Sequence, residues 1–206
     1  MVQNNFDDGI NILKNDEYFN PIINSMDVPI FPKESDYFQS LIKFIIYQQL
    51  SIKAARKIYM RFLLLFKESK INPENFKKIS HKNLRNVGIS KSKIKYMHEV
   101  ANSFVQNNDL LNNIDSLSDE EIIIKLTKIK GIGPWTADMF LMFTLHRLDI
   151  FPIKDLGIKK GMKKLFKLDH IPTDEFMIKE SKRWSPYRTI CCLYLWKLID
   201  GNNFEW

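Results

Sequence analysis

Apolar residues recur at intervals of three or four along most of this chain, which is the spacing of amphipathic α-helices. In one stretch, Phe38, Leu41, Ile42, Ile45 and Ile46 fall on a single helical stripe. The alternation of apolar and polar residues that marks β-strands is scarce. The pattern predicts an all-α fold of about ten helices and no sheet, with helices near 11–19, 36–49, 51–66, 81–86, 90–105, 157–166, 173–182 and 186–199, a short helix opening at Pro73, and two more on either side of 129–133.

Several serines stand where these helices should begin. Ser51, Ser90 and Ser185 each precede a helical pattern, and a serine hydroxyl at that position accepts a hydrogen bond from the first helical turn. Ser118 and Glu121 have the spacing of a capping box. We therefore expect these serines to be N-caps.

The chain is organised around residues 126–160. Two glycines, Gly131 and Gly133, lie between two helical patterns, and Pro134 suits the first turn of the second helix. Backbone N–H groups at such a glycine turn and helix start point outward and form a site for phosphate. Asp155 follows in a second loop that contains proline and glycine.

These segments resemble the helix-hairpin-helix (HhH-GPD) superfamily of base-excision DNA glycosylases. The resemblance rests on GIGPWTA at 131–137 and FPIKDLGIKKG at 151–161, and it extends to IYQQLS at 46–51, LRNVGISKSK at 84–93 and WSPYRT at 184–189. Within the superfamily the chain looks like the alkylpurine enzymes similar to 3-methyladenine DNA glycosylase II. The resemblance implies two helical lobes, one of residues 33–132 that ends in the hairpin and one of 1–32 together with 133–206.

Asp155 is the expected catalytic residue. Cleavage of an N-glycosidic bond builds positive charge on the sugar, and a fixed carboxylate stabilises that charge and can orient the attacking water. The alternative is an ordinary helix N-cap, because Asp155 precedes a helical pattern. The resemblance favours catalysis, since it matches Asp155 to the family's aspartate; Asp138, the nearest rival carboxylate, is explained by its place early in a helix.

Trp135 occupies the position at which lyase-competent relatives have a lysine. Because an indole forms no Schiff base, the resemblance implies a monofunctional enzyme that leaves an abasic site. Lys154 is the lysine next to Asp155 in sequence, and we expect it to face solvent or DNA.

Base flipping needs a pocket for the extruded base and a wedge that fills the vacated space. The resemblance places Trp135 and Trp196 in the pocket, with Tyr47 and Met139 as further members, although aromatic residues at helical spacing also form ordinary cores. An aromatic face would attract a cationic alkylated base. Gln49 or Leu50 matches the wedge, and ordinary packing at a helix end is the alternative.

Phosphate contacts are expected from the amides of Gly131 and Gly133 and from the residues Lys130, Ser90, Lys93 and Lys159. A solvated face is the alternative for the lysines, and their clustering on both sides of the hairpin and Asp155 favours a DNA track. The resemblance also implies a sodium or potassium ion on the backbone carbonyls of Thr127, Ile129 and Ile132, with no other cofactor required.

The composition indicates a basic protein and excludes a four-cysteine metal cluster. The 206 residues carry a net charge of +7, which favours a polyanionic partner. The two cysteines, Cys191 and Cys192, are neighbours on a predicted helix and cannot supply a four-cysteine cluster. No signal peptide or membrane-spanning run is visible. We expect a monomer that is cytoplasmic and nucleoid-associated in a prokaryote or nuclear in a eukaryote.

Together these features predict a DNA glycosylase that flips alkylated purines of the 3-methyladenine type out of double-stranded DNA and excises them without strand cleavage. Two alternatives stay open. One is a glycosylase for an oxidised or deaminated base. The other is a protein that binds damaged DNA without catalysis, against which Asp155 argues.

Overall fold

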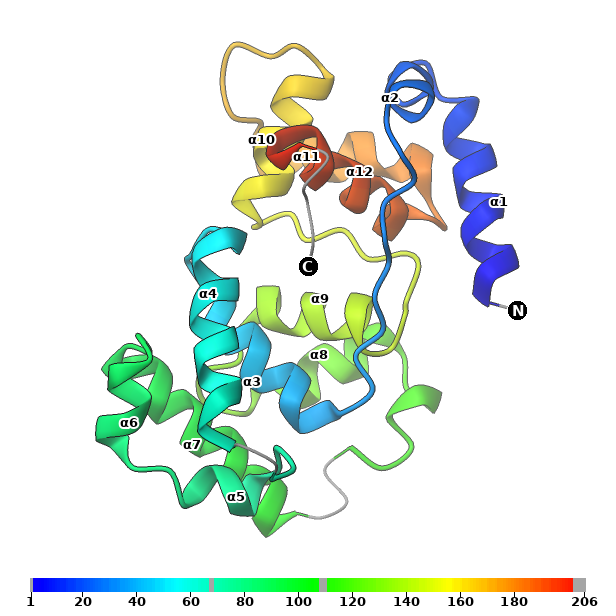
Figure 1. Ribbon diagram of the computed structural model, residues 1–206. Helices are drawn as coiled ribbons and strands as arrows, with labels where there is room; N and C mark the ends of the chain where they lie inside the picture. The colour runs from blue at the N-terminus through cyan, green and yellow to red at the C-terminus, as the bar shows by residue number, and fades with distance from the viewer. Residues whose placement is uncertain (1, 67–68, 108–110, 202–206) are drawn as a thin grey trace. The chain divides into compact units, whose positions relative to one another are not determined.

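The computed structural model describes residues 2–66, 69–107 and 111–201, with side chains described from Phe6 onward. Over these residues the chain forms twelve α-helices and three short 3-10 helices (Figure 1). None of the described residues lies in a strand. The expectation of an all-α fold is confirmed. Among the same residues, no helix combines the length and apolar character that crossing a membrane requires.

The chain divides into two compact units. The hairpin unit comprises residues 33–145. It contains α3 (Tyr37–Tyr47), α4 (Ile52–Leu63), α5 (Pro73–Lys77), α6 (His81–Asn86), α7 (Lys91–Gln106), α8 (Asp119–Thr127) and α9 (Pro134–Phe143), with 3-10 turns η1 (Leu64–Phe66) and η2 (Ile114–Ser116). The aspartate unit joins the residues up to 32 to those from 146 onward. It contains α1 (Val2–Lys14), α2 (Asn20–Ser25), α10 (Leu156–Leu165), α11 (Asp174–Ser181) and α12 (Arg188–Asp200), with η3 (Lys182–Trp184).

The boundary between the units follows Leu145 rather than residue 132, where we had expected it. The reason is the packing of α9, which lies against α3 and α8 of the hairpin unit. Both helices of the glycine hairpin therefore belong to one unit.

Each unit is built on one helix that is buried on all sides. In the hairpin unit, nine of the eleven residues of α3 are buried, and α4, α7 and α9 pack around it (Figure 1). In the aspartate unit, nine of the thirteen residues of α12 are buried, and α1, α2 and α10 pack against it. A helix that is mostly apolar around its circumference belongs in a core, and the polar residues that α3 buries are bonded there: Ser40 Oγ donates to Asp36 O, and Lys43 pairs with Glu34.

The N-terminal segment differs from the single helix expected near residues 11–19. Helix α1 ends at Lys14, and α2 begins at Asn20 with Pro21 in its first turn. Between them Asp16 Oδ1 accepts hydrogen bonds from the amides of Tyr18 (2.9 Å) and Phe19 (3.1 Å). An aspartate that captures nearby N–H groups favours a turn over continued helix, so the apolar pattern is interrupted here.

Most of the expected helix caps are confirmed. Ser51 and Ser90 accept hydrogen bonds from Ala54 N and Lys93 N at the starts of α4 and α7. Ser118 and Glu121 form a capping box at the start of α8. Ser185 is the exception, and its actual partner is described with the functional site.

Candidate functional site

The turn between α8 and α9 requires glycine at position 131. Gly131 has a φ of +100°, and a Cβ added there would lie 2.3 Å from the Cβ and Cγ atoms of Tyr96 in α7. Glycine adopts such a φ without steric cost, and here it also allows the backbone to pass the tyrosine. The turn predicted from the two glycines is therefore fixed by packing as well as by backbone conformation.

Gly133 serves a different purpose, because its φ of −100° is accessible to any residue and a Cβ would meet no atom within 4 Å. It is the N-cap residue of α9. Among the described hydrogen bonds, none takes up the amides of Lys130, Gly131 or Gly133. The side chains of Lys128 and Lys130 are exposed beside them. Open space, unused N–H groups and a helix start make this end of the hairpin suited to an anion.

The carbonyls expected to hold a monovalent cation lie in the same turn. The hydroxyl of Thr127 donates to Ile123 O at 2.7 Å, and the amide of Ile132 donates to Ile129 O at 3.0 Å. A carbonyl oxygen has a second lone pair, so the hydrogen bond to Ile129 O does not exclude a cation. The cation site stays a prediction.

Asp155 combines the two roles considered for it. Its carboxylate is buried, with 9% relative exposure, and it is the N-cap residue of α10. Oδ1 accepts hydrogen bonds from Ile158 N at 2.8 Å and from Trp196 Nε1 at 2.9 Å. The N-cap interpretation is correct as a description of local structure. The additional indole N–H fixes the carboxylate from outside its own helix, which a cap alone does not need.

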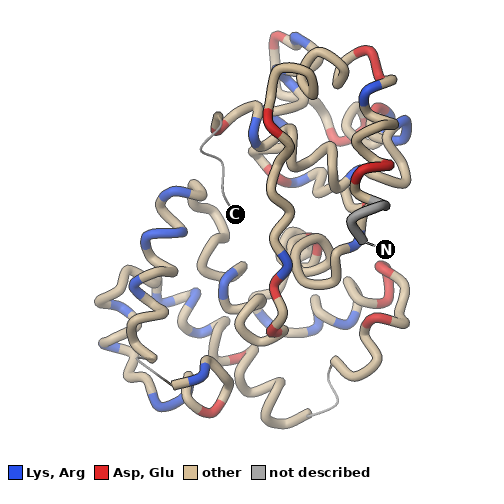
Figure 2. Tube along the Cα trace, turned by 45° about the vertical axis from the view of Figure 1, so that its right-hand side comes forward, with Lys and Arg blue, Asp and Glu red and all other residues tan. Residues whose placement is uncertain are grey.

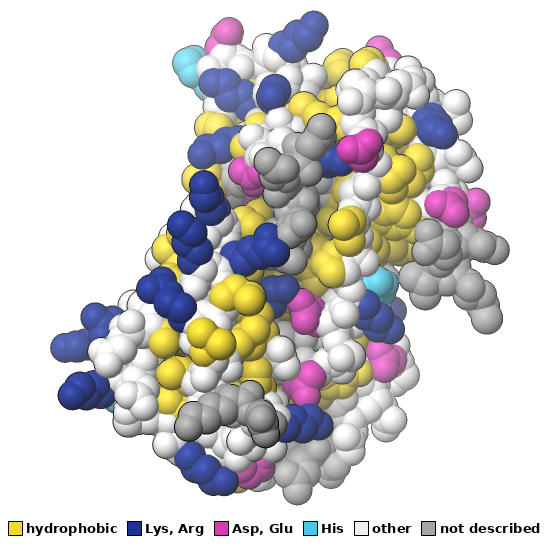
Figure 3. All heavy atoms as spheres, in the orientation of Figure 1, with side chains coloured by type: hydrophobic (Ala, Val, Ile, Leu, Met, Phe, Trp, Pro, Cys, Tyr) yellow, Lys and Arg dark blue, Asp and Glu magenta, His cyan; other side chains and the backbone are white. Residues whose placement is uncertain are grey.

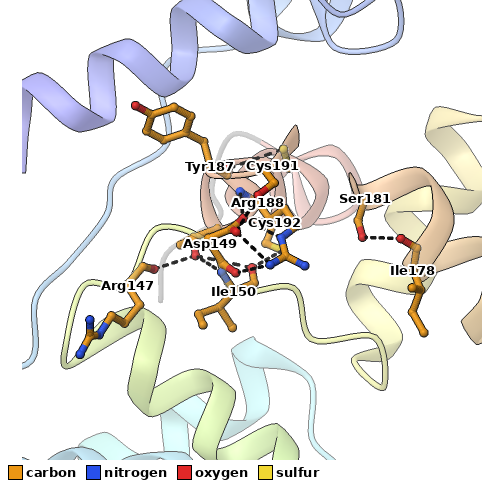
Figure 4. Close-up of polar contacts among 11 residues, drawn as sticks. Arg147, Asp149, Ile150, Ile178, Ser181, Tyr187, Arg188, Cys191 and Cys192 are labelled. Atoms are coloured by element: carbon orange, nitrogen blue, oxygen red, sulfur yellow. Dashed lines mark hydrogen bonds and ion pairs between the residues drawn. The ribbon is translucent and has the colours of Figure 1, made fainter. Parts of the chain in front are cut away.

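The loop that leads to Asp155 is held by one face of α12. Thr189, Cys192 and Trp196 follow one another at spacings of three and four, so they lie along one side of the helix. Cys192 Sγ lies 3.7 Å from Ile150 O (Figure 4). Thr189 N donates to Leu148 O at 2.9 Å, and Trp196 Nε1 donates to Asp155 Oδ1. The position of the aspartate is thus set by a buried helix of the same unit.

Asp149 anchors the start of this loop. Arg188 donates from Nε to Oδ1 at 2.6 Å and from Nη2 to Oδ2 at 2.9 Å (Figure 4). Ser185 Oγ donates to Oδ2 at 2.8 Å. This corrects the expected N-cap role of Ser185. Helix α12 begins at Arg188. Its N-cap residue is Tyr187, whose side chain makes no capping hydrogen bond. The hydroxyl of Ser185 is instead bound by Asp149, whose carboxylate also accepts from Arg188 N at 3.4 Å.

The Asp149 anchor should make stability depend on pH. Burial alone would raise the pKa of Asp149, but the hydrogen bonds and charge of Arg188 together with Ser185 outweigh it and hold the pKa below its ordinary value. The ionised carboxylate therefore stabilises the fold above the unfolded pKa of about 3.9, and this contribution is lost as pH falls through the lower folded pKa. Asp149→Asn should lower the melting temperature at pH 7, and the difference from wild type should shrink as the pH falls below about 4.

Thermal unfolding at several pH values checks this, with Asp8→Asn as the control because the Asp8 side chain is exposed. A gap between wild type and Asp149→Asn that is constant from pH 7 to pH 3 would contradict the assignment of the anchor.

The two lysines nearest Asp155 in sequence are bound to an acidic residue of α11. Lys154 and Lys159 both form ion pairs with Asp174, the second of them at 2.6 Å. The side chain of Lys154 is 68% exposed, as we expected for a residue that faces solvent or DNA. The expected phosphate contact of Lys159 would require it to share or leave its carboxylate partner. Lys160 and Lys164 are exposed on the same helix, with Lys164 Nζ donating to Leu198 O at 3.0 Å.

The wedge candidates lie at an exposed turn, whereas one expected phosphate ligand does not face outward. Gln49 and Leu50 are both exposed between α3 and α4. Lys93 Nζ donates to the carbonyls of Ile46 at 2.8 Å and Gln48 at 2.7 Å, so its expected role as a phosphate contact is corrected to a bond with the end of α3. Ser90, the N-cap residue of α7, is exposed, and its phosphate contact stays a prediction.

The residues expected in a base pocket are buried to different degrees. Trp135, in the first turn of α9, is partly exposed, whereas Met139 is fully buried and Trp196 is 2% exposed. Tyr47 is 4% exposed, Lys43 Nζ lies 5.7 Å from its ring centroid, and burial raises its pKa to about 12. In this structure Trp196 acts on Asp155 through its N–H, and a role of these four residues in holding a base stays a prediction.

One basic surface was not anticipated from the sequence pattern. Helix α4 carries Lys53, Arg56, Lys57 and Arg61 and no acidic residue, and all four side chains are exposed. Figure 2 shows basic positions spaced along both units, and Figure 3 shows dark-blue side chains gathered on the α4 side of the hairpin unit. The charge run and its place after Gln49 and Leu50 are visible in the sequence, but only the fold shows that all four side chains are exposed.

Comparison with known proteins agrees with these features. Residues 42–186 match the family described as HhH-GPD superfamily base excision DNA repair protein. The chain belongs to this superfamily, and the resemblance stated from the sequence is confirmed.

Two comparisons with fission yeast and one with a bacterium show that the chain is similar to proteins named 3-methyladenine DNA glycosylases. DNA-3-methyladenine glycosylase 1 of Schizosaccharomyces pombe is 35% identical over 167 residues, which are 80% of this chain and 73% of that protein. The solved structure of the S. pombe 3-methyladenine DNA glycosylase Mag1 in complex with abasic DNA has a TM-score of 0.85 and 31% identity, covering 96% of this chain and 98% of that one. The Bacillus subtilis protein YfjP, provisionally named a DNA-3-methyladenine glycosylase, is 34% identical, and this chain spans 62% of its length.

Proposed function

We propose that this protein is a monofunctional DNA glycosylase that excises alkylated purines of the 3-methyladenine type from double-stranded DNA by hydrolysis of the N-glycosidic bond. The observation that carries the proposal is Asp155, a buried carboxylate fixed by Ile158 N and Trp196 Nε1 in a chain of the HhH-GPD superfamily. Relatives that cover most of this chain are named DNA-3-methyladenine glycosylases. The neighbour Mag1, solved with abasic DNA, supports DNA as the partner.

In the proposed reaction the Asp155 carboxylate stabilises the positive charge that develops on the sugar as the base departs. Because Oδ1 is held by two donors, the carboxylate cannot rotate away from the position in which it acts. Water supplies the hydroxyl that replaces the base, so the products are the free base and an abasic site. The amides at Gly131 and Gly133 bind phosphate and hold the duplex independently of sequence.

The same residues argue against strand cleavage. A lyase needs an amine that forms a Schiff base with the sugar, and Trp135 provides none. Lys154 is ion-paired with Asp174, so its amine already has a carboxylate partner other than the sugar. The proposed enzyme acts as a monomer and needs no cofactor for hydrolysis.

Base release from a panel of defined duplexes tests the proposal. The panel contains 3-methyladenine, 7-methylguanine, an oxidised guanine and a deaminated base, each in the same sequence. We expect release of the alkylated purines, an intact strand until hot alkali is added, and no protein–DNA adduct after borohydride.

Each other outcome points to a different conclusion. Release of only the oxidised or deaminated base would assign a different lesion, and tight binding without any release would assign a damage-binding protein. A borohydride-trapped adduct that is lost in Lys154→Ala would show that the chain is a lyase.

A further inference from the structure

We propose that Gln48 and Lys93 are positioning residues that hold the exposed turn at Gln49 and Leu50 in a fixed place relative to the glycine hairpin. Insertion of the turn into the duplex is thereby coupled to the binding of phosphate by the hairpin. This inference rests on the proposed function, in which that turn is the wedge.

The turn itself has an unfavourable backbone conformation. Gln48 has φ −48° and ψ 130°, Gln49 has φ +56°, and Leu50 N donates to Tyr47 O at 3.3 Å. These are the features of a type II turn, whose third residue is usually glycine or asparagine. A glutamine in the left-handed region is strained, and it persists there only where its surroundings enforce the conformation.

Lys93 supplies part of that enforcement. Its ammonium donates to Ile46 O and Gln48 O, at 2.8 and 2.7 Å, and these carbonyls belong to the last turn of α3 and its C-cap residue. Carbonyls at a helix C-terminus have no partner within the helix, and a cation placed there is favourable. Burial lowers the pKa of Lys93, as expected for an ammonium directed inward rather than toward solvent.

Gln48 connects the same turn to the hairpin. Its side-chain Nε2 donates to Gly131 O and to Thr136 Oγ1, both at 2.9 Å. One acceptor lies in the glycine turn and the other in the first turn of α9. The backbone carbonyl of Gln48 is bound by Lys93, so this residue is held from two sides immediately before the wedge.

The third element of the junction is α7. Tyr96, one helical turn after Lys93, packs directly against Gly131. Helix α7 therefore contacts both the end of α3, through Lys93, and the glycine turn, through Tyr96. The wedge therefore has a fixed position and direction relative to a duplex whose phosphates are bound at Gly131 and Gly133.

Such an arrangement matters for base flipping because unstacking a base pair costs free energy, which contacts with the wedge must offset. If the turn were not held in place, it would lose those contacts, while the hairpin would still bind phosphate. The proposal thus separates two quantities, since loss of Gln48 or Lys93 should impair flipping while leaving nonspecific affinity unchanged.

The test compares Lys93→Met and Gln48→Met, which keep side-chain length and remove the donors, with Lys95→Met as the matched control. Lys95 is exposed on the same helix, so its replacement removes the same charge. Three measurements are made: the single-turnover rate of base release at saturating enzyme, the Kd for undamaged duplex at several salt concentrations, and the fluorescence of 2-aminopurine beside the lesion, which reports unstacking.

For Lys93→Met and Gln48→Met we expect base release to slow by about tenfold, the effect of removing one or two preorganised hydrogen bonds, and a weaker fluorescence signal. The Kd for undamaged duplex and its salt dependence should match those of the Lys95→Met control. When the lesion is unpaired, opposite an abasic position, flipping costs less, and the rates of the two variants should approach that of wild type.

Equal slowing on paired and unpaired lesions would overturn the proposal, because it would indicate a general structural defect. A Lys93→Met variant whose log Kd against log salt slope falls by about one would assign Lys93 to phosphate instead. If Lys93→Met fails to fold, Gln48→Met decides the question. Absence of base release by the wild type would refute the proposed function alone, and the 2-aminopurine signal would still report the wedge.

Discussion

Replacing Asp155 by asparagine should lower the rate of base excision by about 10²-fold or more, because it removes the negative charge that stabilises the developing positive charge on the sugar. Binding to a duplex that carries an abasic analogue should largely survive, since the hairpin contacts lie on other residues. Single-turnover excision and an equilibrium binding titration measure the two quantities separately.

The structure explains why this substitution isolates chemistry from folding. Asparagine is about as good an N-cap residue as aspartate, and its side-chain oxygen can accept from both Ile158 N and Trp196 Nε1 as Oδ1 does now. Asp155→Ala is the contrasting variant, because loss of the cap should cost about 1 kcal/mol of stability. We expect the asparagine variant to melt close to wild type and the alanine variant to melt lower.

Excision by Asp155→Asn at nearly the wild-type rate would contradict the catalytic assignment. The residue would then be a structural cap, and its burial beside Trp196 would be a packing feature of the aspartate unit.

The parts of the site that were predicted from the sequence are those encoded by local patterns. The glycine turn, the capping box at Ser118 and the helix start at Asp155 each depend on residues within a few positions of one another, where backbone preferences act directly. Gly131 shows the limit of such patterns. Its φ of +100° could be expected from the turn, but its contact with Tyr96 depends on how α7 packs.

The errors arose where a side chain binds a distant segment. Lys93 was expected to face phosphate, yet it binds the carbonyls of Ile46 and Gln48. The phosphate contact expected of Lys159, which pairs with Asp174, stays a prediction. A charge pattern shows that a lysine is present but not whether a carbonyl or carboxylate from elsewhere in the fold lies within reach. Ser185 was misassigned for the same reason, because Asp149 binds its hydroxyl.

The second large effect is expected at Gly133, where stability and DNA binding should change in opposite directions. Gly133→Asp introduces a good N-cap residue at the start of α9, at a position with ordinary φ and no atom within 4 Å of the new Cβ. The variant should therefore fold at least as stably as wild type, with a gain of up to about 1 kcal/mol from the cap and the helix dipole. The same carboxylate would stand where a phosphate is proposed to bind.

Duplex affinity of Gly133→Asp should fall by about tenfold to a hundredfold at low salt, for damaged and undamaged DNA alike, because two negative charges about 4 Å apart near a protein surface repel by roughly 1–4 kcal/mol. Gly133→Asn is the matched control, since it has the same size and capping ability without the charge. The difference between the two variants measures repulsion alone and should shrink as salt screens it, while both should bind less tightly than Gly133→Ala if the side chain also obstructs the phosphate. Melting curves and binding titrations from low to high salt provide these values. If the Asp and Asn variants bind equally at every salt concentration, no phosphate lies at the start of α9, and the hairpin is a structural turn in which Gly131 serves the packing of Tyr96.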